Sequence, residues 1–178
     1  VTGPAFNDQL TLGTYTTQVT VNGGAGNDVI IGGGSSANIY GGDGNDWIVS
    51  GTAADFIYGG AGADLVDFSA FAGGIGVTLA APGSPGVGGG DVLYDIENVL
   101  GTAYADTITG NGLANNLFGG AGNDTLDGGA GDDLLVGGAG ADSLTGGAGY
   151  DYAAYDSAVM VDMRNAAAGT GDAGGDTF

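Results

Sequence analysis

Aspartate residues recur at one fixed place in a glycine-rich phrase, Gly-Gly-x-Gly-x-Asp. Complete phrases end at Asp28, Asp46, Asp64, Asp124, Asp133, Asp142 and Asp151. A carboxylate can transfer protons or bind a cation, but the chain has no histidine, no cysteine and one basic residue, Arg164. Acid–base and nucleophilic catalysis therefore lack their usual partners, and zinc lacks its preferred ligands. The phrase favours cation binding, and we expect no enzyme activity.

The charge balance narrows the class of partner. Of 178 residues, 21 are acidic and one is basic, which gives a formal net charge of −20. Such a chain repels itself, nucleic acid and anionic lipid, and attracts cations. No apolar run in the sequence is long enough to span a membrane, so we expect neither nucleic-acid binding nor membrane insertion. A disordered acidic chain is the alternative, above all without metal, although the apolar residues are periodic rather than sparse.

Both halves of the chain repeat every nine residues, in arrays that span residues 23–67 and 101–154. The eighth residue of each line is aliphatic until Ala153 closes the series: Ile30, Ile39, Ile48, Ile57, Val66, Ile108, Leu117, Leu126, Leu135 and Leu144. A period of nine fits a short strand with one inward side chain, followed by a six-residue turn. Glycine at the first, second and fourth places permits conformations that a β-carbon forbids. The aspartates should therefore lie on stacked turns between short strands.

The spacing of complete phrases in the first array defines a larger unit. They begin at Gly23, Gly41 and Gly59, eighteen residues apart, and the lines between them have lost parts of the phrase. The structural unit is then two nonapeptides, one for each side of a flattened coil. Alternate lines should lie on opposite edges of that coil.

The phrase and its register resemble the RTX (repeats-in-toxin) calcium-binding nonapeptide. The resemblance extends to residues 90–120, "GDVLYDIENVLGTAYADTITGNGLANNLFGG", which look like the I-E-N-V segment that leads into such arrays. It implies an all-β fold, a calcium-stabilised parallel β-roll (β-solenoid) with two stacked arrays joined by a spacer. The calcium ions would lie between successive turns on the same edge.

The resemblance assigns calcium binding to two kinds of oxygen. The sixth-place side chains are those of Asp28, Asp46, Asp64, Asp106, Asp124, Asp133, Asp142 and Asp151. Glycines at the second and fourth places offer main-chain carbonyls: Gly24, Gly26, Gly42, Gly44, Gly60, Gly62, Gly120, Gly122, Gly129, Gly131, Gly138, Gly140, Gly147 and Gly149. Calcium takes six to eight oxygens at about 2.3–2.6 Å, so each ion would be shared by two turns. Solvated Asp-Gly turns are the simpler alternative, which columns of aspartates disfavour.

The edges are not equivalent. One edge of the first array carries two inter-turn sites, whereas the other, with Ala37 and Asp55, should bind poorly. Sites that involve "GTAYAD" or "GNGLANN" should be weak or completed by water, and the best lie between complete phrases. The expected columns are Asp28, Asp46 and Asp64; Asp106, Asp124 and Asp142; and Asn115, Asp133 and Asp151.

The number of ions is bounded by charge. Ten calcium ions would cancel the whole net charge of −20, so a content of about six to nine is electrostatically reasonable. Without ions, stacking brings like charges together, and a thin aliphatic row cannot offset their repulsion. Folding and calcium binding should be one event.

Three segments lie outside the arrays. Residues 1–22 contain two alternating runs, "DQLTL" and "TQVTV", which predict strands that cap the entry to the roll. Residues 68–100 form a spacer that ends in the I-E-N-V segment, and residues 155–178 begin a second spacer on the same plan. The chain therefore reads as part of a longer protein.

Residues that flank the inward position should face outward. In the first array they are large and apolar: Val29, Ile31, Tyr40, Trp47, Val49, Phe56, Tyr58 and Leu65. Such a patch usually marks an interface, so it predicts docking to a protein partner or self-assembly. Alternatively, Phe68, Phe71, Ile75 and Val77 of the spacer fold back and cover it. In the second array most outward residues are threonine, serine or aspartate.

Three classes of function remain. The favoured one is a non-catalytic, calcium-dependent structural or adhesive module. The second is an accessory module of a secreted enzyme, because modules of the family accompany proteases, lipases and polyuronate epimerases. The third, binding of ice or a polymer, needs a regular threonine ladder that the irregular outward residues do not supply. The resemblance also implies export in the unfolded state and an extracellular or cell-surface location, where calcium is plentiful.

Overall fold

The computed structural model describes residues 2–83, 86–155 and 159–162, and every regular element in them is a β-strand. The chain forms two compact units. Unit 1 is Val1–Phe68 with Leu79–Asn98, and unit 2 is Ser69–Thr78 with Val99–Phe178. Most of the expected second spacer, residues 155–178, lies outside the described residues. The described part contains no helix long and apolar enough to cross a bilayer.

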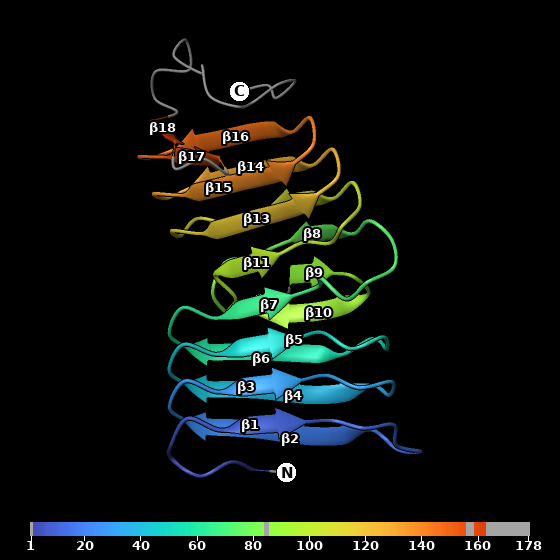
Figure 1. The fold of residues 1–178 in the computed structure, drawn as a ribbon. Coiled ribbons are helices and arrows are strands. Elements are labelled where there is room, and N and C mark those ends of the chain that lie inside the picture. Colours follow the sequence, from blue (N-terminus) through green and yellow to red (C-terminus); the bar gives the residue numbers. More distant parts are fainter. Residues whose placement is uncertain (1, 84–85, 156–158, 163–178) are drawn as a thin grey trace. The chain divides into compact units, whose positions relative to one another are not determined.

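Unit 1 is a coil whose successive strands alternate between two sheets (Figure 1). One sheet has the order β1-β3-β5-β7 and the other has the order β2-β4-β6-β10-β9. All pairs are parallel except the β9–β10 hairpin. The strands are β1 (Gln9–Thr11), β2 (Val19–Ala25), β3 (Val29–Ile31), β4 (Ala37–Asp43), β5 (Trp47–Val49), β6 (Phe56–Ala61), β7 (Leu65–Asp67), β9 (Gly86–Gly88) and β10 (Asp91–Tyr94).

Unit 2 repeats the plan. Its sheets have the orders β8-β12-β14-β16 and β11-β13-β15-β17-β18. Pairing is parallel throughout the first and from β13 to β17, and β18 adds antiparallel to β17. The strands are β8 (Gly76–Thr78), β11 (Asn98–Leu100), β12 (Thr107–Thr109), β13 (Asn116–Ala121), β14 (Thr125–Ala130), β15 (Leu134–Ala139), β16 (Ser143–Ala148), β17 (Tyr152–Tyr155) and β18 (Val159–Asp162). The predicted parallel β-roll is confirmed.

The eighth-place residues form the core of both units. In unit 1, Ile30 lies in register with Ile48, and Ile48 with Val66, while Ile39 lies beside Ile57 in the facing sheet. Every eighth-place side chain of the two arrays is fully buried, including that of Ala153, where the aliphatic rule ends. Each strand contributes one inward residue per line, so the core is thin, as the period predicts.

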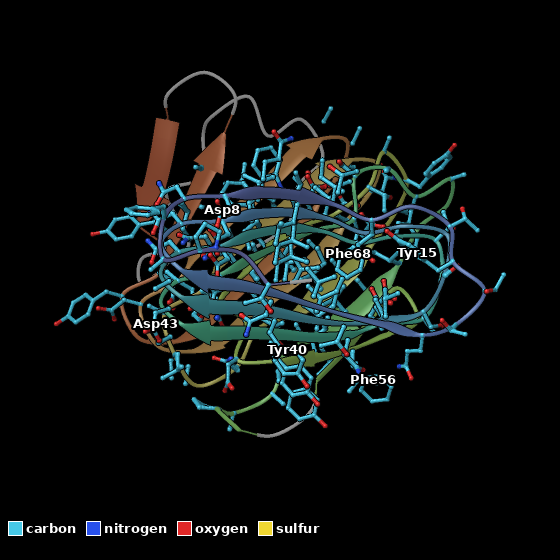
Figure 2. All side chains as sticks on the ribbon, turned by 90° about the horizontal axis from the view of Figure 1, so that it is seen from below. Asp8, Tyr15, Tyr40, Asp43, Phe56 and Phe68 are labelled. Carbon is cyan, nitrogen blue, oxygen red and sulfur yellow. The ribbon has the colours of Figure 1, made fainter. Side chains whose placement is uncertain are left out.

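The spacer is partly built into the coils. In unit 1, Leu93 of β10 lies in register with Ile57 and continues the inward column. In unit 2, Val77 of β8 is buried and lies in register with Ile108. Phe68 is fully buried in unit 1, and Figure 2 shows it between the sheets. Phe68 and Val77 thus point inward and do not cover the outward apolar residues.

The outward apolar residues of the first array do not form the single face that the sequence predicts. Five of them lie on β3, β5 and β7: Val29, Ile31, Trp47, Val49 and Leu65. Tyr40, Phe56 and Tyr58 lie on β4 and β6, in the other sheet. Since the inward residues of both sheets share one interior, the two groups point to opposite faces. The prediction of one patch is wrong because alternate lines belong to opposite sheets.

The core predicts a position-specific loss of stability. Replacement of the fully buried Ile48 by alanine should lower the free energy of unfolding by about 2–5 kcal/mol, because it leaves a cavity in a core one side chain deep. Ile31→Ala, at a half-buried outward position of the same sheet, is the matched control and should cost clearly less. Urea unfolding at saturating calcium measures both. Equal losses would contradict the assignment of the eighth place to the core.

Candidate metal centres

The sixth-place aspartates of unit 1 form a column of buried carboxylates. Each reaches back to the preceding turn: Asp46 Oδ1 accepts a hydrogen bond from Asp28 N, and Asp64 Oδ1 accepts one from Asp46 N, both at 2.8 Å. Asp28, Asp46 and Asp64 are at most 2% exposed. The column is the one predicted from the eighteen-residue spacing. Side chains and amides of successive turns are therefore locked together along this edge.

Unit 2 has the two predicted columns. On one edge, Asp124 Oδ1 accepts from Asp106 N at 2.8 Å, and Asp142 Oδ1 accepts from Asp124 N at 2.9 Å. On the other edge, Asp133 Oδ1 accepts from Asn115 N at 2.8 Å, and Asp151 Oδ1 accepts from Asp133 N at 3.1 Å. The sequence thus placed these sixth residues on the correct edges.

The second carboxylate oxygen of most of these aspartates is buried without a hydrogen-bond donor. This holds for the Oδ2 atoms of Asp8, Asp28, Asp46, Asp55, Asp64, Asp124 and Asp133. A buried acceptor without a partner costs about 1–3 kcal/mol, and more when it carries charge. A row of such atoms is therefore an unfavourable arrangement unless cations neutralise it.

Glycine at the first place makes room for these oxygens. A β-carbon at Gly23 would collide with Asp28 Oδ2 of its own turn and with the Gly41 carbonyl oxygen of the next turn. The same pair of oxygens recurs at Gly41, where Asp46 Oδ2 and the Gly59 carbonyl converge. In unit 2 the pattern appears at Gly119 and Gly128. Each complete turn therefore presents a carboxylate oxygen beside a carbonyl oxygen of its neighbour.

Glycines at the second and fourth places supply further carbonyls. Gly42 has φ +121°, a conformation that side-chain-bearing residues rarely adopt, and a β-carbon there would meet the Gly24 carbonyl oxygen of the preceding turn. Gly44 faces the Gly26 carbonyl in the same way. All fourteen glycines predicted at these places have positive φ. The second and fourth carbonyls of one turn thus face the next turn, and the first carbonyl of that turn faces back.

This set of oxygens fits calcium. Calcium prefers carboxylate and carbonyl oxygens and tolerates irregular geometry. The described residues contain no group of three or more acidic side chains suited to a metal ion. Only two aspartates flank each gap between turns, so main-chain carbonyls and water must complete the shell. Asp28, Gly24, Gly26 and Gly41 are the residues that would hold one ion, and equivalent places would hold the others.

Incomplete phrases satisfy their oxygens locally. Thr102 replaces the second glycine of "GTAYAD", and its amide and hydroxyl donate to Asp106 Oδ2 and Oδ1 at 2.6 and 2.9 Å. In "GNGLAN", Asn111 N donates to Asn115 Oδ1 at 2.8 Å. These hydrogen bonds take the place of a cation at part of each site. They supply a physical reason for the expected weakness, which stays a prediction.

The second edge of unit 1 is built differently. Asp55 Oδ1 accepts from Ala37 N at 2.7 Å, and Asp91 Oδ1 accepts from Asp55 N at 2.8 Å, while the Ser50 hydroxyl donates to Asp91 Oδ2. Serine stands here in place of the first glycine, and alanine in place of one aspartate. Poor calcium binding at this edge also stays a prediction.

Three acidic residues join the columns although the sequence analysis missed them. Asp8 precedes Asp28, and Asp28 Oδ1 accepts from Asp8 N at 2.8 Å. The repeated "ND" before a strand, at Asn7-Asp8 and Asn27-Asp28, could have revealed this turn. Asp91 and Glu97 follow Asp55 and Asp64, but no nonapeptide phrase surrounds them.

Burial raises the pKa of several of these carboxyl groups. The pKa of Asp64 rises to about 7, because burial disfavours its charged form and Asp46, Glu97 and Asp95 add negative charge nearby. Burial and the neighbouring Asp106 and Asp142 raise the pKa of Asp124 to about 6. Protons and cations therefore compete for the same oxygens in the folded state.

Turns of fixed period, buried carboxylates and converging carbonyls define the class of calcium-binding β-rolls. Comparison with known protein families matches four copies of the RTX calcium-binding nonapeptide repeat, at residues 20–36, 40–74, 86–126 and 118–153. The chain belongs to this family, as the sequence analysis predicted. No curated protein matches it.

The raised pKa values predict an unusual pH dependence for the metal-free protein. Between the ordinary value of 3.8 and about 7, folded Asp64 holds a proton that the unfolded chain has lost. The unfolded state then binds fewer protons, so the free energy of unfolding falls as the pH rises through this window. In chelator, the β-sheet signal in circular dichroism should therefore be larger at pH 5 than at pH 8.

Saturating calcium should reverse that order, because at low pH protons displace the ions from the same carboxylates. A metal-free signal that grows with pH would contradict the assignment of raised pKa values to the column.

Proposed function

We propose that this chain is a non-catalytic structural and adhesive scaffold of a secreted or cell-surface protein, and that calcium ions between its turns hold it folded. The observation that carries the proposal is the row of buried Oδ2 atoms without donors, each beside a carbonyl of the next turn. The family repeat binds calcium, and the β-roll is a non-catalytic repeat fold. Calcium binding by a structural module is therefore the firm part of the function.

Electrostatics supports a structural role for the ions. Each gap of a complete column is flanked by two buried carboxylates, and one calcium ion neutralises that pair. The inward aliphatic row is one side chain deep per strand, so hydrophobic burial alone gives the coil little to set against stacked charge. We propose about six to nine ions for the chain, which would cancel most of the net charge of −20.

The ligands we propose are the sixth-place carboxylates together with the second- and fourth-place carbonyls predicted from the sequence. Carbonyl-rich sites with few charges suit the weak affinities of extracellular modules. Such a module would stay unfolded at low intracellular calcium and fold after export. This supports the proposed extracellular or cell-surface location, which the chain's family also favours.

The adhesive part of the proposal rests on exposed aromatic residues of unit 1. Trp47 is 45% exposed on one face, and Phe56 and Tyr40 are 41% and 37% exposed on the other. Tyr40, Tyr58 and Tyr94 stack in a ladder, with ring centroids 4.7 and 4.5 Å apart. Figure 2 shows Tyr40 and Phe56 pointing away from the coil interior. Rigid aromatic surfaces of this kind favour docking to a protein.

Removal of one column carboxylate should weaken calcium-driven folding. Wild-type protein should gain β-sheet signal cooperatively at roughly 0.1–1 mM calcium and not with magnesium, since calcium fits irregular oxygen sites and magnesium does not. Asp46→Asn removes a buried charge from the column and should shift the midpoint to severalfold higher calcium. Asp43→Asn removes the same charge from an exposed side chain in the same turn and should leave the midpoint unchanged.

Circular dichroism of metal-free protein titrated with each ion measures these midpoints. A chain fully folded in chelator would refute the coupling of folding to calcium. Equal shifts for Asp46→Asn and Asp43→Asn would show that net charge, and not the column, sets the affinity.

A further inference from the structure

The column of unit 1 continues past the last complete phrase. Glu97 Oε2 accepts a hydrogen bond from Asp64 N at 2.9 Å, as the aspartate of the next turn does elsewhere in the column. Asn98 N donates to the Asp64 carbonyl oxygen at 2.9 Å, which is the bond that Leu65 N makes to the Asp46 carbonyl. Asn98 Nδ2 donates to the same oxygen at 3.2 Å. Glu97 and Asn98 therefore occupy the sixth and seventh places of a further turn.

The first place of this turn is taken by Asp95. A β-carbon at Gly59 would collide with Asp64 Oδ2 and with the Asp95 carbonyl oxygen, the same pair of oxygens found at Gly23 and Gly41. Asp95 has φ +51°, and it is the one non-glycine residue with positive φ in the described part of the chain. Aspartate tolerates this conformation better than most residues. Residues 95–97 thus reproduce with three residues what a complete phrase does with six.

The shortened turn explains the identity of residue 97. Glutamate is one methylene longer than aspartate, and Glu97 bonds the Asp64 amide at a distance close to the 2.8 Å of the aspartate bonds. Two carboxylates, those of Asp64 and Glu97, therefore flank this gap, as in the gaps between complete turns. Asp64 is fully buried, and its Oδ2 has no hydrogen-bond donor.

We propose that Asp64, Glu97 and the Asp95 carbonyl form an additional calcium site that closes the column of unit 1. The site lies beyond the two that the complete phrases of this edge provide, and no Gly-Gly-x-Gly-x-Asp phrase supplies its outer half. The inference rests on the calcium-binding role proposed above. It gives the I-E-N-V segment a chemical task, because the segment ends the stack with a ligand pair instead of an exposed, unneutralised aspartate.

Calcium counts on single variants test the site. Glu97→Gln keeps a side-chain oxygen acceptor but removes one of the two charges of the gap. It should bind one calcium ion fewer than the wild type in equilibrium dialysis at moderate calcium, with an affinity at that site at least about tenfold weaker. Asp95→Asn is the matched control, because it removes the same charge, tolerates positive φ and keeps an acceptor for Gly83 N, which donates to Asp95 Oδ1. It should bind as many ions as the wild type.

A double variant separates a shared site from two independent effects. If Asp64 and Glu97 hold one ion, Asp64→Asn with Glu97→Gln should lose no more ions than either single variant. Circular dichroism at saturating calcium must first show that each variant is folded. If Glu97→Gln does not fold, wild-type crystals grown with terbium decide. An anomalous peak beside Asp64 Oδ2 and the Asp95 carbonyl supports the site, and its absence overturns it.

The outcomes distinguish this inference from the proposed function. A wild type that binds calcium, with Glu97→Gln equal to it in count and affinity, overturns the additional site and leaves the calcium roll intact. A wild type that binds no calcium overturns both.

Discussion

The stacking of buried carboxylates is the interaction on which the rest of the structure depends. Every coil of a complete column places an aspartate against the amide of the preceding turn, which uses one carboxylate oxygen and leaves the other buried without a donor. The core cannot outweigh the resulting repulsion, because each strand buries one side chain per line. Calcium is therefore a component of the fold, comparable to a disulfide in a small secreted domain.

Glycine serves the ligand geometry in these turns. At the first place it leaves room for a carboxylate oxygen beside a carbonyl of the next turn, and at the second and fourth places it permits the positive φ that aims carbonyls along the column. Where glycine is missing, as at Thr102, hydrogen bonds from the substitute satisfy the aspartate instead. The oxygen positions are thus preserved by different local means, and the need for a cation changes with them.

The outward surface is free of these demands. The eighth residue fills the core and the first six residues make the turn, so the seventh and ninth places are left to vary. Unit 1 carries aromatic and aliphatic residues there, such as Trp47 and Tyr58, whereas unit 2 carries mainly small polar ones, such as Thr107 and Thr145. Any recognition of a partner is therefore expected on the faces of unit 1, while both units share the same scaffold chemistry.

The sequence by itself determined the inward residues, the glycine places, the main aspartate columns and the family, because all of these repeat at constant separation. Only the tertiary structure brought Asp8, Asp91 and Glu97 into the columns, since their stacking neighbours are 20, 36 and 33 residues away and not 18. It also divided the outward apolar residues between two faces. The physical reason is that stacking joins turns through space, whatever length of chain lies between them, whereas a periodic pattern reports only neighbours at a fixed spacing.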